Sequence, residues 1–194
     1  SDDIVSNEIN ESTLDNLVWL LVISILVVVI VLALTFRSPI MVIAPLTALS
    51  AALIWTYGTM SIIGVEFSIL EVAVAPVVLG LGIDYSIHLQ RRYEINRNSG
   101  QDTVDAWLNS IENLALPLSL AVITTVAAFM ANLFSPLPPL KSFGISLALG
   151  VVTAFFCSTV VVGTLHVLGE RFSGGKLSLA STGSLGEGFS NLMK

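Results

Sequence analysis

Charged residues are scarce in this sequence of 194 residues, where Asp, Glu, Lys and Arg together make up only 11%. A soluble domain usually carries more than twice that fraction, about 25%, so the composition argues against a soluble fold. The basic residues are the rarer ones, with 8 Lys and Arg against 14 Asp and Glu, and they form no patch. Proteins that bind nucleic acid depend on such a patch, and we therefore expect no nucleic-acid partner.

Cysteine and the residue patterns of catalysis are also missing. Cys157 is the single cysteine, so no disulfide can form within the chain, and its apolar neighbours suggest a packing role. No second His, Cys or acidic residue stands at ligand spacing from Asp84 and His88. No Ser/His/Asp set, phosphate loop or dinucleotide fingerprint is visible. We therefore expect no enzymatic activity, no metal site and no bound cofactor.

Long apolar runs dominate the sequence instead. A helix needs about 20 residues to cross a bilayer, at a rise of about 1.5 Å per residue. Several runs of that length carry no charged residue or only one. We predict membrane spans at about 17–36, 39–60, 70–90, 114–134 and 142–168. The sequence thus predicts an all-α membrane protein, a five-transmembrane-helix bundle.

Lys and Arg fall mainly on one side of these spans. With the N-terminus outside, only Lys141 lies on the outer side. The cytoplasmic side then receives Arg37, Arg91, Arg92, Arg97, Arg171, Lys176 and Lys194. Because basic residues concentrate in cytoplasmic loops, we expect a multi-pass protein of the plasma or inner membrane, with its N-terminus outside and its C-terminus in the cytoplasm.

The segment 102–113, between the third and fourth spans, has the pattern of an amphipathic helix. Asp102 suits its N-cap. Apolar residues recur at helical spacing at Val104, Trp107, Leu108, Ile111 and Ala115. We expect this interfacial helix to lie in the headgroup layer, or simply to connect and position the fourth span.

The two ends differ from the spans in composition. Residues 1–16 are acidic and polar, and we interpret them as an external leader or as the remnant of a larger extracytoplasmic domain. Residues 173–194 are rich in Gly and Ser, which is typical of a flexible linker. The chain is thus expected to be a natural half-protein or a fragment of a longer one.

One carboxyl group lies deep inside a predicted span. Asp84 interrupts an apolar run between Val77 and His88. A charged Asp near the middle of a membrane helix costs about 2.5–3.5 kcal/mol, so such a residue is a functional-site hypothesis, with proton transfer as its leading use. No Lys or Arg lies within any predicted span, and Asp84 therefore has no cationic partner inside this chain.

Two threonines on the next span lie at a matching predicted depth. Asp84 is six residues from Gln90, which places it about 9 Å from the cytoplasmic boundary. Thr124 is seven residues beyond Pro117, or about 10 Å deep. Thr124 and Thr125 could therefore offer Asp84 a hydroxyl partner, or each could bond to a carbonyl of its own helix.

Small residues lie close to Asp84 on its own helix. Gly80 and Gly82 suggest a closely packed partner helix, or a water-filled gap, against the Asp84 face. Pro76 removes a backbone amide, which predicts a kink above the site. The alternative is that the glycines only pack and that the kink has no part in function.

Tyr85 and the two histidines complete the polar candidates. Tyr85 either forms a hydrogen bond in the interior or fills space. His88, one turn nearer the cytoplasm than Asp84, could pass protons between the loop and Asp84, or it could only reach to the interface. His166, near the end of the last span, is interpreted as an interfacial residue.

The run Gly80-Leu-Gly-Ile-Asp84-Tyr85-Ser-Ile-His88, followed by Arg91-Arg92-Tyr93-Glu94, resembles the fourth-helix motif of the resistance–nodulation–division (RND) superfamily of transporters. Within this superfamily, the sequence most resembles the branch of hydrophobe/amphiphile exporters and MMPL-type lipid transporters, which are related to Patched and to sterol-sensing domains. Also matching the pattern are Phe36-Arg37-Ser38-Pro39, Thr124-Thr125 and the Ser135-Pro136 turn before Phe143-Gly144. The resemblance implies that the five spans are helices two to six of one six-helix half, without its first helix, its porter domain and the other half.

A function follows from this resemblance. In the family, the fourth-helix Asp carries the proton that drives export. By position Asp84 and Tyr85 inherit that role, and Thr124 resembles the relay hydroxyl. Classical drug pumps of the family pair their aspartates with an intramembrane Lys, which this chain lacks, so its proton cycle is expected to differ in detail.

The sequence and the resemblance together predict the half-domain of a prokaryotic exporter that is driven by the proton-motive force. The expected substrates are lipids or other hydrophobic or amphiphilic molecules, and protons are the coupling ion. The expected partners are membrane lipids, the substrate, and a second half or a second copy of the chain. One alternative is a sterol- or lipid-sensing module that binds a ligand between helices without pumping, and another is a purely structural bundle.

Overall fold

The computed structural model describes residues 19, 22–36, 38–65 and 68–172. The predicted leader at 1–16 and the predicted tail at 173–194 lie outside the described residues. The first predicted span, 17–36, is described in part, as the apolar helix Val22–Thr35.

Helices account for nearly all of the described chain. After Val22–Thr35 come α2 (Pro39–Ile63), the 3₁₀ helix η1 (Ile69–Ala73), α3 (Val74–Asn98), α4 (Thr103–Met130), the 3₁₀ helix η2 (Ala131–Phe134) and α5 (Pro138–Phe172). No β-strand occurs in the residues that the structure describes. Within the described ranges, four helical segments are long and apolar enough to cross a membrane, and Val22–Thr35 is a shorter apolar helix beside them. The predicted all-α membrane bundle is confirmed.

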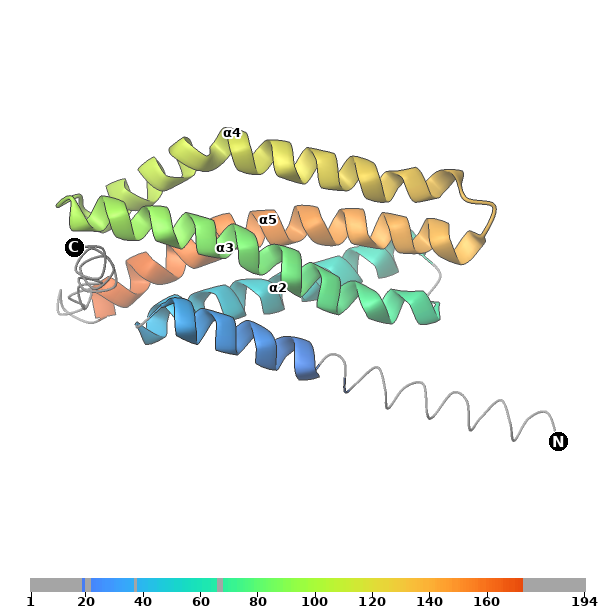
Figure 1. The fold of residues 1–194 in the computed structure, drawn as a ribbon, viewed down its shortest axis with the longest axis horizontal. Helices are drawn as coiled ribbons and strands as arrows, with labels where there is room; N and C mark the ends of the chain where they lie inside the picture. Colours follow the sequence, from blue (N-terminus) through green and yellow to red (C-terminus); the bar gives the residue numbers. More distant parts are fainter. Residues whose placement is uncertain (1–18, 20–21, 37, 66–67, 173–194) are drawn as a thin grey trace, which may run out of the picture.

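The long helices run antiparallel to one another in chain order (Figure 1). The α3–α4 connection lies at one end of the bundle, which we call the Gln101 end. The α2–α3 and α4–α5 connections lie at the opposite end, which we call the Ser135 end. Short connections of this kind force successive helices to pack side by side.

The predicted interfacial helix at 102–113 is present, but not as a separate element lying flat in the headgroups. It forms the first turns of α4, which continues to Met130. Figure 1 shows α4 as a bent helix rather than two helices. Pro117 lies inside it, and a proline removes one helical hydrogen bond and so bends the helix. The segment stays in the bundle because Trp107 and Ser110 are buried against the neighbouring helices.

α5 occupies the middle of the bundle and contacts α2, α3 and α4 (Figure 1). Glycines allow this close approach, as is common between membrane helices. A Cβ added at Gly82 of α3 would overlap Leu49 of α2, and a Cβ added at Gly150 of α5 would overlap Val78 of α3. These glycines therefore fix how closely α2, α3 and α5 pack.

α4 lies at the edge of the bundle. Only 11% of the most apolar window of Thr103–Phe134 is buried, against 50% for the windows in Leu70–Asn98 and Pro138–Glu170. Most of α4 therefore presents an apolar surface to lipid or to another membrane segment.

Candidate proton-carrying site

α3 has two faces of opposite character. One face is buried in the bundle and includes Val74, Val78, Gly82, Tyr85, Leu89 and Tyr93. The other face is exposed and carries, at intervals of three or four residues, Gly80, Asp84, His88, Arg91 and Ile95. We call this second set the Asp84 face. The candidate proton carrier thus points away from the helices with which α3 packs.

The Asp84 carboxyl forms no hydrogen bond or ion pair with any residue that the structure describes. Gly80, one turn earlier on the same face, leaves open space, because a Cβ built on it would have no atom within 4 Å. A carboxyl on an apolar membrane helix is unfavourable in contact with lipid alone. The Asp84 face therefore needs water or a second protein surface against it.

Gly82 does not share this face, contrary to the expectation that both glycines lie against the same partner. It is buried, and an added Cβ would meet Leu49 of α2 and Ala154 of α5. Two residues along a helix correspond to a rotation of about 200°, so Gly80 and Gly82 point in opposite directions. Gly82 serves packing within the chain, and Gly80 alone keeps the Asp84 face open.

Tyr85 is buried beside Asp84 and fills space between α3 and α5. Its ring packs edge-on against Phe155, with ring centroids 5.9 Å apart and an interplanar angle of 88°. The next residue, Ser86, donates a hydrogen bond of 2.9 Å to Ser158 of α5. The residues after Asp84 therefore hold its helix firmly against α5.

Thr124 and Thr125 bond to their own helix. The Thr124 hydroxyl donates to the carbonyls of Leu120 and Ala121, both at 3.0 Å. The Thr125 hydroxyl donates to Ala121 at 2.8 Å. Two arrangements were predicted for these hydroxyls, a bond to Asp84 or a bond to their own helix, and the structure has the second. Neither threonine forms a hydrogen bond with Asp84.

His88 and Pro76 flank the site along α3. His88 is exposed and lies one turn from Asp84 on the same face. Pro76 falls in the first turn of α3, directly after η1. A proline is tolerated at that position because first-turn amides have no partner within the helix, and the predicted kink stays a prediction.

The interior contains polar groups that sequence reasoning missed. Glu71 and Gln90 are fully buried, and His166 is only 5% exposed. His166 is thus buried between helices rather than exposed at the end of the last span, and its depth in the membrane stays a prediction. Its ring packs at 4.6 Å from the ring of Tyr93 and at 5.8 Å from that of Trp107, measured between centroids. The burial of Gln90 could have been predicted from helical spacing, because Gln90 and Tyr93 continue the buried stripe of α3.

An ion pair closes the Gln101 end of the bundle. Arg97 of α3 contacts Glu170 of α5 at 2.6 Å, and Thr103 of α4 donates to the same carboxylate. Arg97 also donates to the Gln101 carbonyl at 2.8 Å. Three helices are therefore tied together at this end by charged hydrogen bonds. No group of three or more His, Cys, Asp or Glu suited to a metal ion occurs within the described ranges.

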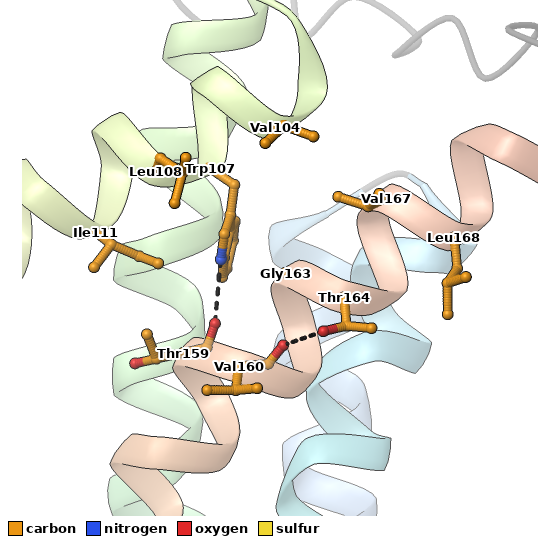
Figure 2. A pocket seen from close by; sticks show the side chains of 10 residues that line it. All are labelled: Val104, Trp107, Leu108, Ile111, Thr159, Val160, Gly163, Thr164, Val167 and Leu168. Atoms are coloured by element: carbon orange, nitrogen blue, oxygen red, sulfur yellow. Dashed lines mark hydrogen bonds between the residues drawn. The ribbon is translucent and has the colours of Figure 1, made fainter.

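An apolar groove lies between α4 and α5 near the same end. Its volume is about 460 Å³, and its walls are formed by residues of these two helices alone. Figure 2 shows Trp107 standing between them, with its Nε1 donating to the carbonyl of Thr159. The distance is 3.1 Å, and a Cβ added at Gly163 would overlap the Trp107 indole. The groove has the size and chemistry to hold part of a lipid chain.

The profile of the MMPL family matches residues 3–178 of the chain. A protein of Methanocaldococcus jannaschii that is named as a membrane protein is 33% identical over 141 residues, which are 73% of this chain and 36% of that protein. The hopanoid transporter HpnN of Rhodopseudomonas palustris is 32% identical over 100 residues, 52% of this chain and 12% of the transporter. The sulfolipid-1 exporter MmpL8 of Mycobacterium tuberculosis is 25% identical over 150 residues, 75% of this chain and 14% of the exporter.

The chain spans about a third or less of the length of these relatives. The match covers most of the chain, including every described helix. The resemblance that the run Gly80–His88 suggested is thereby confirmed at the level of the family. This chain belongs to the MMPL family.

Proposed function

We propose that the chain is the transmembrane half-domain of an RND-type exporter that uses the proton-motive force to move lipids or other hydrophobic or amphiphilic molecules. The observation that carries the proposal is the position of Asp84. Its carboxyl lies on an exposed face of a membrane helix, without a hydrogen bond or ion pair to any described residue. An intramembrane carboxyl in that position can gain and lose a proton as its access to water changes.

The roles of the neighbouring residues follow from their positions. Tyr85 and Ser86 fix α3 against α5, so that the Asp84 backbone is held in place. His88 lies on the same face and nearer the Gln101 end, where it can exchange protons with water that reaches Asp84. Thr124 and Thr125 join the relay only if their hydroxyls leave their own helix. They are therefore the weaker members of the proposed relay.

A second membrane surface completes the site in this proposal. The Asp84 face and the apolar outer surface of α4 both point away from the bundle. Family relatives are at least about three times as long as the matched part of this chain. We propose that another half, or a second copy, covers the Asp84 face and leaves water beside Gly80.

The orientation belongs to the same proposal. The ends of α3 and α5 at the Gln101 end carry Arg97 and Glu170, and Arg91 and Arg92 lie near that end of α3. Basic residues favour the cytoplasmic side. The Gln101 end is therefore placed in the cytoplasm and the Ser135 end outside.

The test is extrusion of a fluorescent phospholipid from vesicles that contain the full transporter. A proton gradient is imposed, and wild type is compared with Asp84→Asn and Asp84→Glu. Asn keeps the shape and hydrogen-bonding capacity but cannot ionise, so Asp84→Asn should abolish extrusion, whereas Asp84→Glu should retain part of it. Extrusion at the wild-type rate from Asp84→Asn would refute the proposal.

One observation favours a second candidate, a lipid-sensing module that binds its ligand without pumping. It is the groove between α4 and α5, which is apolar and is lined in part by Trp107. In that case a photoactivatable phospholipid should label the groove, and Gly163→Leu should prevent the labelling. Asp84→Asn would then leave both labelling and function unchanged.

A further inference from the structure

Glu71 is a carboxyl that the proposed proton cycle does not use. It lies in η1, directly before α3, at the Ser135 end of the bundle. None of its surface is exposed. Asp84 lies on the outward face of the same continuous helical segment, so the segment carries two carboxyl groups in opposite surroundings.

The described neighbours of the Glu71 carboxyl do not form a hydrogen bond with it. The Ser146 hydroxyl of α5 lies near it, but that hydroxyl donates its hydrogen bond to the Ser142 carbonyl at 2.9 Å. Neither carboxyl oxygen has a partner of hydrogen-bond geometry within the part of the chain that the structure describes. A buried carboxylate in this state is strongly unfavourable, and the neutral, protonated acid is favoured.

Three elements pack around Glu71, and they bring few charged or titratable groups to it. From α2, the Tyr57 hydroxyl donates to the Glu71 backbone carbonyl at 3.2 Å. From α5 comes the uncharged Ser146, while Lys141 is exposed at the start of that helix. From α3 the first acid is Asp84, on the opposite, exposed face. No cation among these groups stabilises a negative charge on Glu71.

Helix capping does not account for this carboxyl. Ser68 and Glu71 have the spacing of a capping box, in which each side chain bonds to the backbone amide of the other. Ser68 is the N-cap of η1, but it forms no side-chain cap hydrogen bond. Its Oγ is likewise buried without a partner among the described residues. Two neighbouring polar side chains thus have no hydrogen-bond partner from the described residues.

A cavity lies beside Ser68 at the Ser135 end. Its volume is about 440 Å³, and it is lined by Ser68, Leu70, Leu137, Pro139 and Leu140. Ser68 is the polar residue of this lining, and its carbonyl accepts a hydrogen bond of 3.0 Å from the Glu71 amide. Water that enters the cavity therefore comes within one turn of Glu71.

We propose that Glu71 is a second proton-binding group of this chain, which exchanges its proton with water at the Ser135 end through the cavity beside Ser68. The carboxylate takes one proton from water at that end and becomes a neutral acid, and the same oxygen returns the proton to water. The exchange does not depend on Asp84, since the two groups lie on opposite faces. It also does not depend on transport, so it can be tested separately from the proposed function.

The test is infrared spectroscopy of the purified full chain in phosphatidylcholine vesicles, recorded as the pH is changed. The C=O stretch of a protonated, poorly solvated carboxylic acid has a different frequency from that of an acid in water. Wild type should show such a band that disappears as the pH rises. Glu71→Gln should lose this band, whereas Asp84→Asn and the exposed control Glu112→Gln should keep it.

Two results would overturn the proposal. One is a titrating spectrum that is the same in Glu71→Gln and wild type. The other is a Glu71 band that does not change at any pH at which the protein stays folded. If Glu71→Gln does not assemble, Ser146→Ala decides, because removal of that hydroxyl should shift the frequency of the Glu71 band, and an unshifted band contradicts the assignment.

Discussion

At the scale of single residues, the run Gly80–His88 contains residues of two kinds, some on an open face of α3 and others in its packed interior. Gly80 and Asp84 lie on a face that has no neighbour within the described chain, whereas Gly82 lies at the closest contact of α3 with α2 and α5. A motif that looks uniform in sequence therefore serves packing at Gly82 and leaves an open face at Gly80 and Asp84. The distinction rests on helical rotation alone, since successive residues turn by about 100°.

Alanine substitution should separate the two glycines. Gly82→Ala should destabilise the chain by about 1–3 kcal/mol, because its Cβ meets Leu49 and Ala154 in a packed interior. Gly80→Ala should leave stability unchanged or raise it by up to about 1 kcal/mol, because the site is open and alanine favours a helix. Thermal unfolding of both variants in one detergent measures the difference, and equal destabilisation would contradict the assignment of faces.

At the scale of elements, the Gln101 end is where α3, α4 and α5 hold one another. Trp107 links α4 to α5 through its hydrogen bond to Thr159 and its contact with Gly163. The Tyr93 and His166 rings pack against each other, and both lie beside Trp107. The first turns of α4 are therefore a structural part of the bundle and one wall of the lipid-sized groove.

Trp107→Phe tests this role of α4. Phenylalanine keeps an aromatic ring but has no N–H, so the Thr159 carbonyl loses its side-chain donor, and stability should fall by about 1 kcal/mol. Leu108→Ala on the same turn is the control, because Leu108 is 57% exposed and exposed substitutions usually change stability by less than about 0.5 kcal/mol. Thermal unfolding is again the measurement. A larger loss from Leu108→Ala than from Trp107→Phe would be incompatible with the observed packing.

The helices could be predicted from sequence because crossing a membrane requires long apolar runs, and such runs are visible without any knowledge of packing. The continuity of α4 could not be predicted from sequence. Its first turns are amphipathic, which is also typical of a separate surface helix, and only the contacts of Trp107 with α5 decide between the two. Pro117 is equally ambiguous, since a proline ends some helices and only bends others.

The candidate site likewise has residues that could be predicted from sequence and residues that could not. Asp84 is found from sequence because it interrupts an apolar run. Glu71 is not singled out, because it lies at the very start of the predicted span 70–90, where an acid is expected to reach the membrane surface. The available signal was spacing, since Glu71 lies three and seven residues before Val74 and Val78 of the buried stripe. The own-helix bonds of Thr124 could not be decided either, because depth in the membrane says nothing about rotation around the helix.

At the scale of the whole molecule, the exposed surfaces of α3 and α4 are those that the proposed second half or second copy would cover. The chain spans about a third or less of the length of its relatives, and its one intramembrane acid on an outward face has no partner within the described residues. A covering half would remove the Asp84 face from lipid and bring new groups to the carboxyl. The proton cycle is then a property of the assembled transporter rather than of this chain alone.

Cysteine labelling at His88 tests that assembly. In a Cys157→Ala background, which removes the buried native thiol, His88→Cys should react readily with a maleimide in this chain alone. In the full transporter the reaction should be much slower, because the covering half shields the Asp84 face. A cysteine at exposed Leu116 of α4 reports whether labelling reagents reach the membrane region in both samples. Equal reactivity of His88→Cys in both would show that nothing covers this face.

Proton movement coupled to lipid export tests the role of Asp84 most directly. The measurement uses the full transporter in vesicles with a trapped pH-sensitive dye, a fluorescent phospholipid as substrate, and an imposed membrane potential. Each proton that crosses gains about 2.3 kcal/mol per 100 mV, so the potential can drive the cycle. We predict that the phospholipid stimulates proton flux in wild type and that Asp84→Asn abolishes both the flux and the lipid movement. Lipid movement that continues in Asp84→Asn, with or without proton flux, would contradict Asp84 as the proton carrier.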